Sequence, residues 1–562
     1  MQYKHYLKWK EYPHLDKELR DELENMTEKE ITDAFYRNIE FGTAGMRGIM
    51  GAGTNRINKY VVAKASEVFA NYLLSEFSDA KERGVVIAYD NRQHSKDFTH
   101  MSANVLASYG LKVYIFDDLR PTPLLSYAVR ELNACAGIVI TASHNPKEYN
   151  GYKVYDETGC QLVPSKIEKL LSFYGDDEIY KFVEFDRLNE NVIILDHVID
   201  EKYFNDVEKI KLNHFKNTKD LTIVFTPQHG TGYQGIKTLL EREGYSLHIV
   251  ESQAKPDPNF SKTLSPNPEE KRAYKAAIEL ANKVNADIIL CTDPDADRIG
   301  VGVKHNDDYI ILNGNQTGAL LIDYLLSQNK LNDTLASNGI IYNTIVTANS
   351  GNLVAKKYNI KTKALLTGFK YIGEQIEQSI KENGDKFLFG YEESYGYLIS
   401  PICRDKDAIQ AAVLISEMAL YHKNQGLSLY EALLKLYDEI GYFVEKQVSL
   451  VFLGESGLNQ MKKIMNYFHE QSLSSIGNLR ITSTEDYLKQ IKIEDGVTSS
   501  LTLPSSDVVK FNLSDGSFIA IRPSGTEPKC KFYYNFVGES FEDASNKIKQ
   551  CIKEIDDIVN NI

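Results

Sequence analysis

The sequence predicts an α/β fold with several domains, and three observations support this prediction. Short β-branched segments alternate with helix-length amphipathic segments through the N-terminal half, which is typical of strand–helix–strand units with mostly parallel, two-sided sheets. The chain has 562 residues, enough for three or four domains at roughly 150 residues each. After about residue 440 polar, strand-like pieces alternate with helix-like ones, so a smaller α+β domain is expected there.

The predicted elements follow from the hydrophobic pattern. Buried strands are expected where β-branched and apolar residues run together, at residues 85–90, 112–117, 136–140, 221–226, 246–250, 286–291 and 340–346. Helices are expected where apolar residues recur at helical spacing, at 59–75, 98–109, 124–132, 268–284 and 458–471. In the C-terminal part, strands are expected at 517–521 and 531–537. Because ligands of such sheets bind where strands end, the loops after these strands are the candidate sites.

Composition excludes several classes of protein. Apolar residues make up 43% and charged residues 25% of the chain, close to a soluble globular average, which excludes a mostly disordered, collagen-like or disulfide-scaffold protein. The 64 basic and 78 acidic side chains give a formal net charge of −14. A net acidic chain is a poor general nucleic-acid binder, although it can still hold a local basic pocket for a small anion.

Hydropathy and cysteine usage indicate a cytoplasmic protein without a membrane partner. No window approaches 18 uninterrupted apolar residues, so no membrane-spanning helix is expected, and the first residues lack the apolar core of a signal peptide. The six cysteines are scattered and form no Cys-x-x-Cys pair. They are expected to be reduced and structural.

A serine follows the predicted strand at 136–140, in the segment Thr141-Ala142-Ser143-His144-Asn145-Pro146. Ser143 is flanked by small residues, and the segment ends at Pro146, so its hydroxyl is sterically available. The adjacent His144 could orient or polarise a phosphate, and Lys153 places an ammonium group ten residues on. The alternative interpretation is an ordinary Ser/Asn-rich turn.

Three carboxylates follow the predicted strand at 286–291, in the segment Asp293-Pro294-Asp295-Ala296-Asp297-Arg298. Carboxylates at i, i+2 and i+4 of a tight loop can converge on one hard cation, and Mg²⁺ prefers oxygen ligands. An EF-hand loop starting at Asp293 is not supported, since its sixth position would hold Arg298 and its twelfth Lys304. The segment therefore predicts a divalent-metal site, with a solvated acidic turn as the alternative.

Two further segments suit an anion. Arg522-Pro523-Ser524-Gly525-Thr526 offers a guanidinium, two hydroxyls and a flexible backbone that can wrap a phosphate. A glycine-rich stretch ends in Met46-Arg47-Gly48, and Arg92 follows a later strand. Either segment could instead be a structural turn.

One segment suits a sugar, and one is a poor match to a nucleotide site. Gly390-Tyr391-Glu392-Glu393-Ser394-Tyr395-Gly396 offers carboxylate and hydroxyl groups to vicinal sugar hydroxyls, although a plain hairpin loop has the same composition. The spacing Gly-x-Gly-x-x-Gly begins at Gly230, but three residues separate it from the preceding strand. A dinucleotide-binding glycine belongs in the tight turn itself, so a nicotinamide site is not favoured.

Taken together and in this order, the loops near residues 143, 295, 393 and 524 resemble those of the α-D-phosphohexomutase superfamily. Its members are phosphoglucomutases, phosphomannomutases, phosphohexosamine mutases and some phosphopentomutases, and the resemblance covers essentially the whole chain. It implies four domains around a central cleft, three similar α/β domains with mixed sheets and a C-terminal α+β domain. We expect these domains at residues 1–208, 209–324, 325–444 and 445–562.

The resemblance also implies roles for the candidate residues. Ser143 matches the phosphorylated serine, and with Asp293, Asp295 and Asp297 it is expected to bind Mg²⁺. His144, Lys153 and Arg298 match residues near the reacting hydroxyl, and Lys153 is the first candidate for the base, provided that its surroundings lower its pKa. The expected substrate-binding residues are Arg47, Glu392, Ser394, Arg522, Ser524, Gly525 and Thr526.

The implied activity is the interconversion of sugar 1- and 6-phosphates through a phosphoserine and a sugar 1,6-bisphosphate. The metal loop has Pro294 and Ala296 between its aspartates where many members have glycines, but the carboxylate spacing is intact. Glu-Glu-Ser-Tyr-Gly at 392–396 is closer to phosphoglucomutases, which favours glucose phosphate and glucose 1,6-bisphosphate. A mutase for mannose, pentose or hexosamine phosphate, a phosphatase and a silent phosphosugar-binding protein remain alternatives. A monomer or homodimer is expected.

Overall fold

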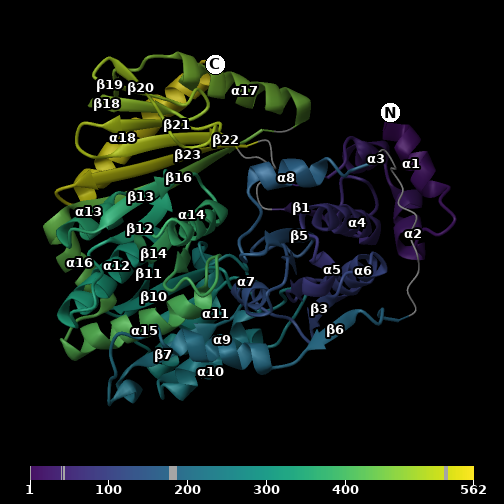
Figure 1. The fold of residues 1–562 in the computed structure, drawn as a ribbon. Helices are drawn as coiled ribbons and strands as arrows, with labels where there is room; N and C mark the ends of the chain where they lie inside the picture. Colours follow the sequence, from purple (N-terminus) through teal and green to yellow (C-terminus); the bar gives the residue numbers. More distant parts are fainter. Residues whose placement is uncertain (1, 40, 42–44, 176–186, 453, 524–528) are drawn as a thin grey trace. The chain divides into compact units, whose positions relative to one another are not determined.

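The computed structural model describes residues 2–39, 41, 45–175, 187–452, 454–523 and 529–562 (Figure 1). The chain forms two compact units. The first comprises Met1–Gly314 and Gly368–Ser428, and the second comprises Asn315–Thr367 and Leu429–Ile562. The segments around Ser143, Asp295 and Glu392 all belong to the first unit, whereas Arg522 belongs to the second.

The first unit contains a six-stranded mixed sheet in the order β1-β5-β4-β2-β3-β6. Strands β4, β2, β3 and β6 run parallel to one another. β5 is antiparallel to β4, and β1 is antiparallel to β5. β2 and β4 are buried along their whole length, as expected for strands covered on both faces. The bounds are β1 (Met46–Ile49), β2 (Val85–Tyr89), β3 (Val113–Phe116), β4 (Ala136–Ile140), β5 (Tyr149–Asp156) and β6 (Val192–Leu195).

Helices cover this sheet and begin at recognisable caps. The Asn58 side chain accepts from the amides of Tyr60 and Val61, which fixes the start of α4. α4 packs on α6 (Figure 1). α7 packs on β2 and β4. The helices here are α4 (Lys59–Glu76), α5 (Ala80–Arg83), α6 (Ser95–Ser108), α7 (Thr122–Glu131), α8 (Pro164–Leu171) and α9 (Val198–Glu208).

A second mixed sheet has the order β11-β10-β9-β7-β8. β8, β7 and β9 run parallel, and β10 and β11 continue the sheet antiparallel. The strands are β7 (Thr222–Thr226), β8 (Ser246–Ile249), β9 (Ile288–Thr292), β10 (Ile299–His305) and β11 (Asp308–Leu312). The helices are α10 (Gly232–Arg242), α11 (Lys275–Val284) and the 3₁₀ turns η1 (Thr218–Asp220), η2 (Glu251–Gln253) and η3 (Lys271–Tyr274).

The returning segment of the first unit adds a β-hairpin and two helices. These are α14 (Phe369–Lys381), β14 (Lys386–Glu392), β15 (Gly396–Leu398) and α15 (Ala408–Asn424). The Asp407 side chain caps α15 by accepting from the amides of Ile409 and Gln410. α15 packs on α10, β9 and β10.

The N-terminal helices were not predicted. They are α1 (Gln2–Lys10), α2 (Lys17–Asn25) and α3 (Glu28–Phe35), and their core is aromatic, with the Trp9 ring edge-on to Phe35 and Tyr60. A capping box of Thr27 and Glu30 starts α3 and was a readable signal. The helices have only eight or nine residues each and are mostly polar, so few apolar residues mark them in the sequence.

The second unit contains a parallel strand pair with three helices and an antiparallel sheet with two. The first group is α12 (Gly314–Leu331), β12 (Gly339–Thr344), α13 (Ser350–Lys357), β13 (Lys361–Leu365) and α16 (Leu429–Ile440). The second group is β16 (Tyr442–Val451), α17 (Gly454–Glu470), β17 (Ser475–Ile476), β18 (Leu479–Asp486), β19 (Ile491–Glu494), β20 (Val497–Ser500), β21 (Val509–Leu513), β22 (Phe518–Pro523), β23 (Lys529–Gly538) and α18 (Phe541–Asn560).

The antiparallel sheet runs β16-β23-β22-β21-β18-β19-β20, with β17 beside β18. α17 and α18 pack on it (Figure 1). Phe468 and Ile548 from the helices lie in one core with Phe511, Ile521 and Phe532 from the strands. This arrangement confirms the smaller α+β region predicted after about residue 440.

Among the described residues, no helix is both long enough and apolar enough to cross a membrane. All six cysteines are buried and unpaired with one another, in agreement with the structural thiols expected from their spacing.

Candidate active site

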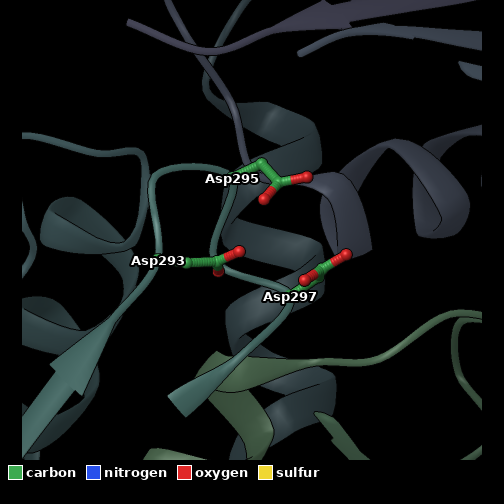
Figure 2. A group of neighbouring side chains, drawn as sticks. All are labelled: Asp293, Asp295 and Asp297. Atoms are coloured by element: carbon green, nitrogen blue, oxygen red, sulfur yellow. The ribbon is translucent and has the colours of Figure 1, made fainter. Parts of the chain in front are cut away.

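Three buried carboxylates converge in the loop between β9 and β10 (Figure 2). One ligand oxygen from each of Asp293, Asp295 and Asp297 lies within 4.8 Å of the others. The Ala296 amide donates to the Asp293 carbonyl (3.1 Å), and the Arg298 amide donates to Asp293 Oδ1 (3.0 Å). These bonds fold the loop back on itself, so the predicted i, i+2, i+4 spacing does bring the side chains together.

The electrostatics of this group favour a cation. Burial, then the charges of Asp295 and Asp297, raise the pKa of Asp293 well above its ordinary value. Asp295 Oδ1 and Asp297 Oδ1 are buried without a hydrogen-bond partner among the described residues. Buried carboxylate oxygens without partners are costly, and a hard divalent cation satisfies them. The residues present therefore fit the Mg²⁺ that the sequence predicted.

Ser143 is in direct contact with this group. Its hydroxyl donates to Asp293 Oδ2 at 2.7 Å and lies 3.2 Å from His144 Nδ1. The backbone of Ser143 is left-handed (φ 51°), a conformation that non-glycine residues rarely adopt. Its amide donates to Thr141 Oγ1 at 2.8 Å. The serine and metal segments, 150 residues apart in sequence, thus meet as predicted.

Arg92 binds the backbone of the serine loop, so the interpretation of Arg92 as an anion-binding residue is corrected. Its guanidinium donates to four backbone carbonyls, those of Ser143 (2.5 Å), Asn145 (2.5 Å), Pro146 (2.8 Å) and Tyr149 (2.9 Å). The same group pairs with buried Asp90 at 3.3 Å. These carbonyls engage both terminal nitrogens of Arg92 and leave it a structural role.

Lys153 reaches the metal group from β5. The register places Lys153 opposite Val139 near the end of β4, and its Nζ lies 2.8 Å from Asp295 Oδ2 and 3.5 Å from Asp297 Oδ2. Burial acts to lower the pKa of Lys153, but the two carboxylates raise it above its ordinary value. The low pKa that a base would need is therefore not produced by these neighbours.

A second lysine, Lys406, was missed by the sequence analysis. Its Nζ lies 3.2 Å from Asp297 Oδ2 and 4.0 Å from Glu392 Oε2. Burial acts to lower its pKa, but Asp297, Asp405 and Glu392 raise it. The only sequence signal is the charged run 404–407, and such runs are usually solvated. Here Arg404, Asp405 and Asp407 are buried.

The predicted sugar segment forms a hairpin beside the metal loop. Glu392 ends β14 and pairs with Gly396, so residues 393–395 form the turn. Glu392 Oε1 accepts from the Gly368 amide at 2.8 Å, and the Ile299 amide donates to the Tyr395 carbonyl at 3.0 Å. Ser394 lies in this turn and is partly exposed. The segment is thus a hairpin, as the alternative interpretation had it, and one that borders the metal loop.

Three other predicted residues surround the same group. Arg298 pairs with Glu269 at 2.5 Å and approaches Asp297 at 3.8 Å. Arg47 Nη1 donates to Asn145 Oδ1 at 2.9 Å, which joins β1 to the serine loop. Burial, then the charges of Arg298 and Arg47, lower the pKa of His144 well below its ordinary value. His144 is therefore neutral at pH 7 and available as a hydrogen-bonding group.

The predicted phosphate segment is described only at its start. Arg522 lies near the end of β22, paired with Lys531 of β23. Ser524, Gly525 and Thr526 lie outside the described residues, as do residues 42–44 of the glycine-rich stretch before Arg47. Their expected roles are predictions only.

The disfavoured Gly-x-Gly-x-x-Gly segment supports the metal loop. The amide and hydroxyl of Thr231 donate to the Pro294 carbonyl at 2.8 and 3.0 Å. A Cβ at Gly230 would lie 2.5 Å from Pro294, so only glycine fits there. Its glycines thus serve packing against the metal loop, in agreement with the sequence argument against a nicotinamide site.

Comparison with known proteins gives the same domain order. Models of the phosphoglucomutase/phosphomannomutase family match this chain as α/β/α domain I at residues 38–180, domain II at 201–306, domain III at 313–439 and the C-terminal domain at 478–540. These matches confirm three α/β domains followed by a smaller C-terminal one. The boundaries expected at 208, 324 and 444 stay predictions.

Individual relatives and structures agree. A phosphoglucomutase from Staphylococcus epidermidis is 38% identical over 552 residues, covering 96% of this chain and 98% of the relative. One from Staphylococcus aureus is 36% identical, covering 94% and 95%. Two solved structures share the fold. One is pp63/parafusin, a phosphoglucomutase from Paramecium in an open form (TM-score 0.68, 19% identity, 93% and 95% covered). The other is a phosphoglucomutase/phosphomannomutase family protein from Burkholderia thailandensis (TM-score 0.67, 18% identity, 92% and 97% covered). Given the identity to the staphylococcal relatives over nearly their whole length, this chain belongs to the phosphoglucomutase/phosphomannomutase family.

Proposed function

We propose that the protein is a phosphoglucomutase that interconverts α-D-glucose 1-phosphate and glucose 6-phosphate through a phosphoserine at Ser143 and a glucose 1,6-bisphosphate intermediate. The observation that carries this proposal is the 2.7 Å contact between the Ser143 hydroxyl and Asp293 within a buried group of three carboxylates. The staphylococcal relatives named phosphoglucomutase support the same activity.

The carboxylates of Asp293, Asp295 and Asp297, with an oxygen on Ser143, are the proposed Mg²⁺ ligands. When bound, Mg²⁺ would supply positive charge to the phosphoryl group being transferred. Arg298 and the two lysines add fixed positive charge around the same point. In a buried site such preorganised charges act more strongly than they would in water.

The transfer itself is balanced by one proton. An oxygen of the sugar forms a bond to phosphorus while the bond from phosphorus to Ser143 Oγ breaks. The sugar hydroxyl gives up its proton, and the serine oxygen ends with one. Lys153, the first candidate for the base, and Lys406 both lie near Asp297 with raised pKa values, so as ammonium groups they are candidates to give the serine oxygen its proton. Neutral His144 lies within hydrogen-bonding reach of the serine hydroxyl.

The remaining candidates are proposed to hold the substrate. Glu392 and Ser394 would bind sugar hydroxyls from the β14–β15 turn, and Arg47 would contact the phosphoryl group near the serine loop. Arg522, with Ser524, Gly525 and Thr526, would hold the phosphate that does not react. The bisphosphate would have to turn over in the site, so each end must fit both phosphate positions.

The test is conversion of glucose 1-phosphate to glucose 6-phosphate with Mg²⁺ and a trace of glucose 1,6-bisphosphate. Mannose 1-phosphate and ribose 1-phosphate are assayed in parallel, and inorganic phosphate release is followed. Fast turnover with glucose phosphate alone supports the proposal. A preference for mannose or ribose phosphate would keep the mechanism and replace the substrate, and phosphate release without isomerisation would indicate a phosphatase.

We also propose a binding partner, a cellular compartment and an oligomeric state. A sugar phosphate is the only partner we propose, and neither nucleic acid nor membrane is part of the proposal. We propose a cytoplasmic monomer or homodimer, and gel filtration with light scattering distinguishes these two states.

A further inference from the structure

Two side chains of strand β5, Lys153 and Tyr155, extend toward the proposed active site. Lys153 and Tyr155 are two residues apart on β5, so their side chains leave the strand on the same face. Lys153 Nζ reaches Asp295 Oδ2 at 2.8 Å. Tyr155 is completely buried, and its hydroxyl donates to Asp405 Oδ2 at 2.8 Å. One strand therefore contacts both the metal loop and the segment that carries Lys406.

Asp405 passes this contact on to Lys406. Its other oxygen, Oδ1, accepts from the Lys406 amide at 2.8 Å and lies 3.4 Å from Lys406 Nζ. The ammonium group then lies 3.2 Å from Asp297 Oδ2, the atom that Lys153 approaches at 3.5 Å. Lys153 and Lys406 thus both approach Asp297 Oδ2. β5, which carries Lys153, is also connected to Lys406 through the hydrogen bonds of Tyr155 and Asp405.

The path of the Lys406 side chain is narrow. A Cβ at Gly396 would lie 2.0 Å from Lys406 Cδ, so the lysine fills the space that any other residue at 396 would need. The centroid of the Phe369 ring lies 5.7 Å from Lys406 Nζ. The backbone at Gly396 thus lies against the lysine side chain, and Asp405 Oδ1 lies beside its ammonium group.

We propose that Tyr155 is a positioning residue, which fixes Lys406 between Asp297 and Glu392 by holding Asp405. The inference rests on the proposed mutase function. Tyr155 itself touches no reacting atom. Its hydroxyl sets the orientation of the Asp405 carboxylate, and that carboxylate sets the place of the lysine.

The chain offers a matched control. Tyr203 is also completely buried, and its hydroxyl donates to Asp407, two residues from Asp405, at 2.7 and 2.8 Å. The Asp407 carboxylate caps helix α15 by accepting from the amides of Ile409 and Gln410, and among the described residues it bonds to neither lysine. Tyr155→Phe and Tyr203→Phe each remove one buried hydroxyl bonded to an aspartate of the same segment. A merely structural role predicts equal effects from the two variants.

The experiment compares kcat, KM and the melting temperature of both variants with wild type, using glucose 1-phosphate. Both should lower the melting temperature by similar amounts. Tyr155→Phe alone should lower kcat, by about tenfold, the size expected when one hydrogen bond to a charged group is lost, with KM changed less than about twofold. Equal kcat values for the two variants would overturn the proposal.

Two further variants make the test independent of a single substitution. In a Lys406→Arg background, Tyr155→Phe should have less than about half of its effect on log kcat, because the group it positions has changed. Undiminished loss there would contradict the proposal. Asp405→Asn, which keeps the size of the side chain, should lower kcat as Tyr155→Phe does. If wild type itself lacks mutase activity, the proposed function fails rather than this inference.

Discussion

Ser143 illustrates how one residue depends on its supports. Its left-handed backbone (φ 51°) costs roughly 1–2 kcal/mol for a residue with a Cβ. Arg92 binds its carbonyl and Thr141 binds its amide, so the conformation is fixed from both sides. The hydroxyl is thereby aimed at Asp293 rather than at solvent. Strain held in this way is typical of a functional residue.

Replacing this serine tests its proposed chemistry. Ser143→Ala should lower mutase turnover by at least about 10⁴-fold, because no other atom can carry the phosphoryl group. The melting temperature should stay close to that of wild type, since the hydroxyl contributes few contacts. Near-normal turnover of Ser143→Ala would show that the catalytic assignment is wrong.

Arg92 is expected to stabilise the fold as well as the serine loop. Arg92→Lys replaces a planar five-donor group with a single ammonium, which cannot reach four carbonyls together. We expect a loss of about 2–4 kcal/mol of unfolding free energy, because buried carbonyls are left unpaired, and a fall in kcat. Arg83→Lys is the control, since Arg83 also binds backbone carbonyls, those of Asn133 and Ala134. A similar kcat loss in both variants would contradict the role of Arg92 at the serine loop.

At the scale of elements, the sequence predicted what hydrophobic periodicity encodes. All seven strands expected in the α/β part are present. Several of them, such as β2 and β4, are fully buried and form continuous apolar runs in the sequence. The antiparallel strands β1, β5 and β11 and the short polar helices α1 to α3 were not predicted. Their residues are partly exposed or polar, so tertiary packing rather than local pattern decides their structure.

One element of the C-terminal sheet should respond to pH. His469 lies in the last turn of α17, with its Nδ1 2.9 Å from Asp486 Oδ2 of β18 and its Nε2 2.8 Å from Asp507 Oδ1. Lys489 Nζ also approaches Asp486 Oδ2. Burial acts to lower the pKa of His469, but Asp507 and Asp486 raise it above its ordinary value. The folded pKa thus exceeds the unfolded one of about 6.5. The histidine therefore contributes stability that is fully present below that value and is lost as pH rises through the folded pKa.

Thermal unfolding of wild type and His469→Gln across this range checks the prediction. The difference in melting temperature between the two should be largest at about pH 6 and should shrink toward about pH 9. An NMR titration of the His469 ring should give a midpoint above the ordinary value. A melting-temperature difference that does not change with pH would count against this assignment.

At the scale of the whole molecule, the site is made by loops that are far apart in sequence. The order of the motifs predicted that Ser143, Asp293, Asp295, Asp297 and Lys153 come together, and they do. Lys406 and the supporting roles of Arg92, Thr231 and Tyr155 could not be predicted. Each acts through a contact with a residue more than fifty positions away, and no local spacing records such contacts.

Metal binding should couple this site to the stability of the unit that carries it. Without a cation, burial and mutual repulsion raise the pKa of Asp293, and two carboxylate oxygens are buried without hydrogen-bond partners in the part of the chain that the structure describes. A cation that binds the folded state alone raises its stability by mass action, by about 2.7 kcal/mol at a hundredfold excess over Kd.

Treatment with EDTA should abolish turnover, and Mg²⁺ should restore it. Mg²⁺ should also raise the melting temperature of wild type but not that of Asp295→Asn. Asp308→Asn, at an exposed aspartate of β11, is the control and should keep the full Mg²⁺ response. An equal response in all three proteins would mean that the cation acts on the general surface charge and not on this group of carboxylates.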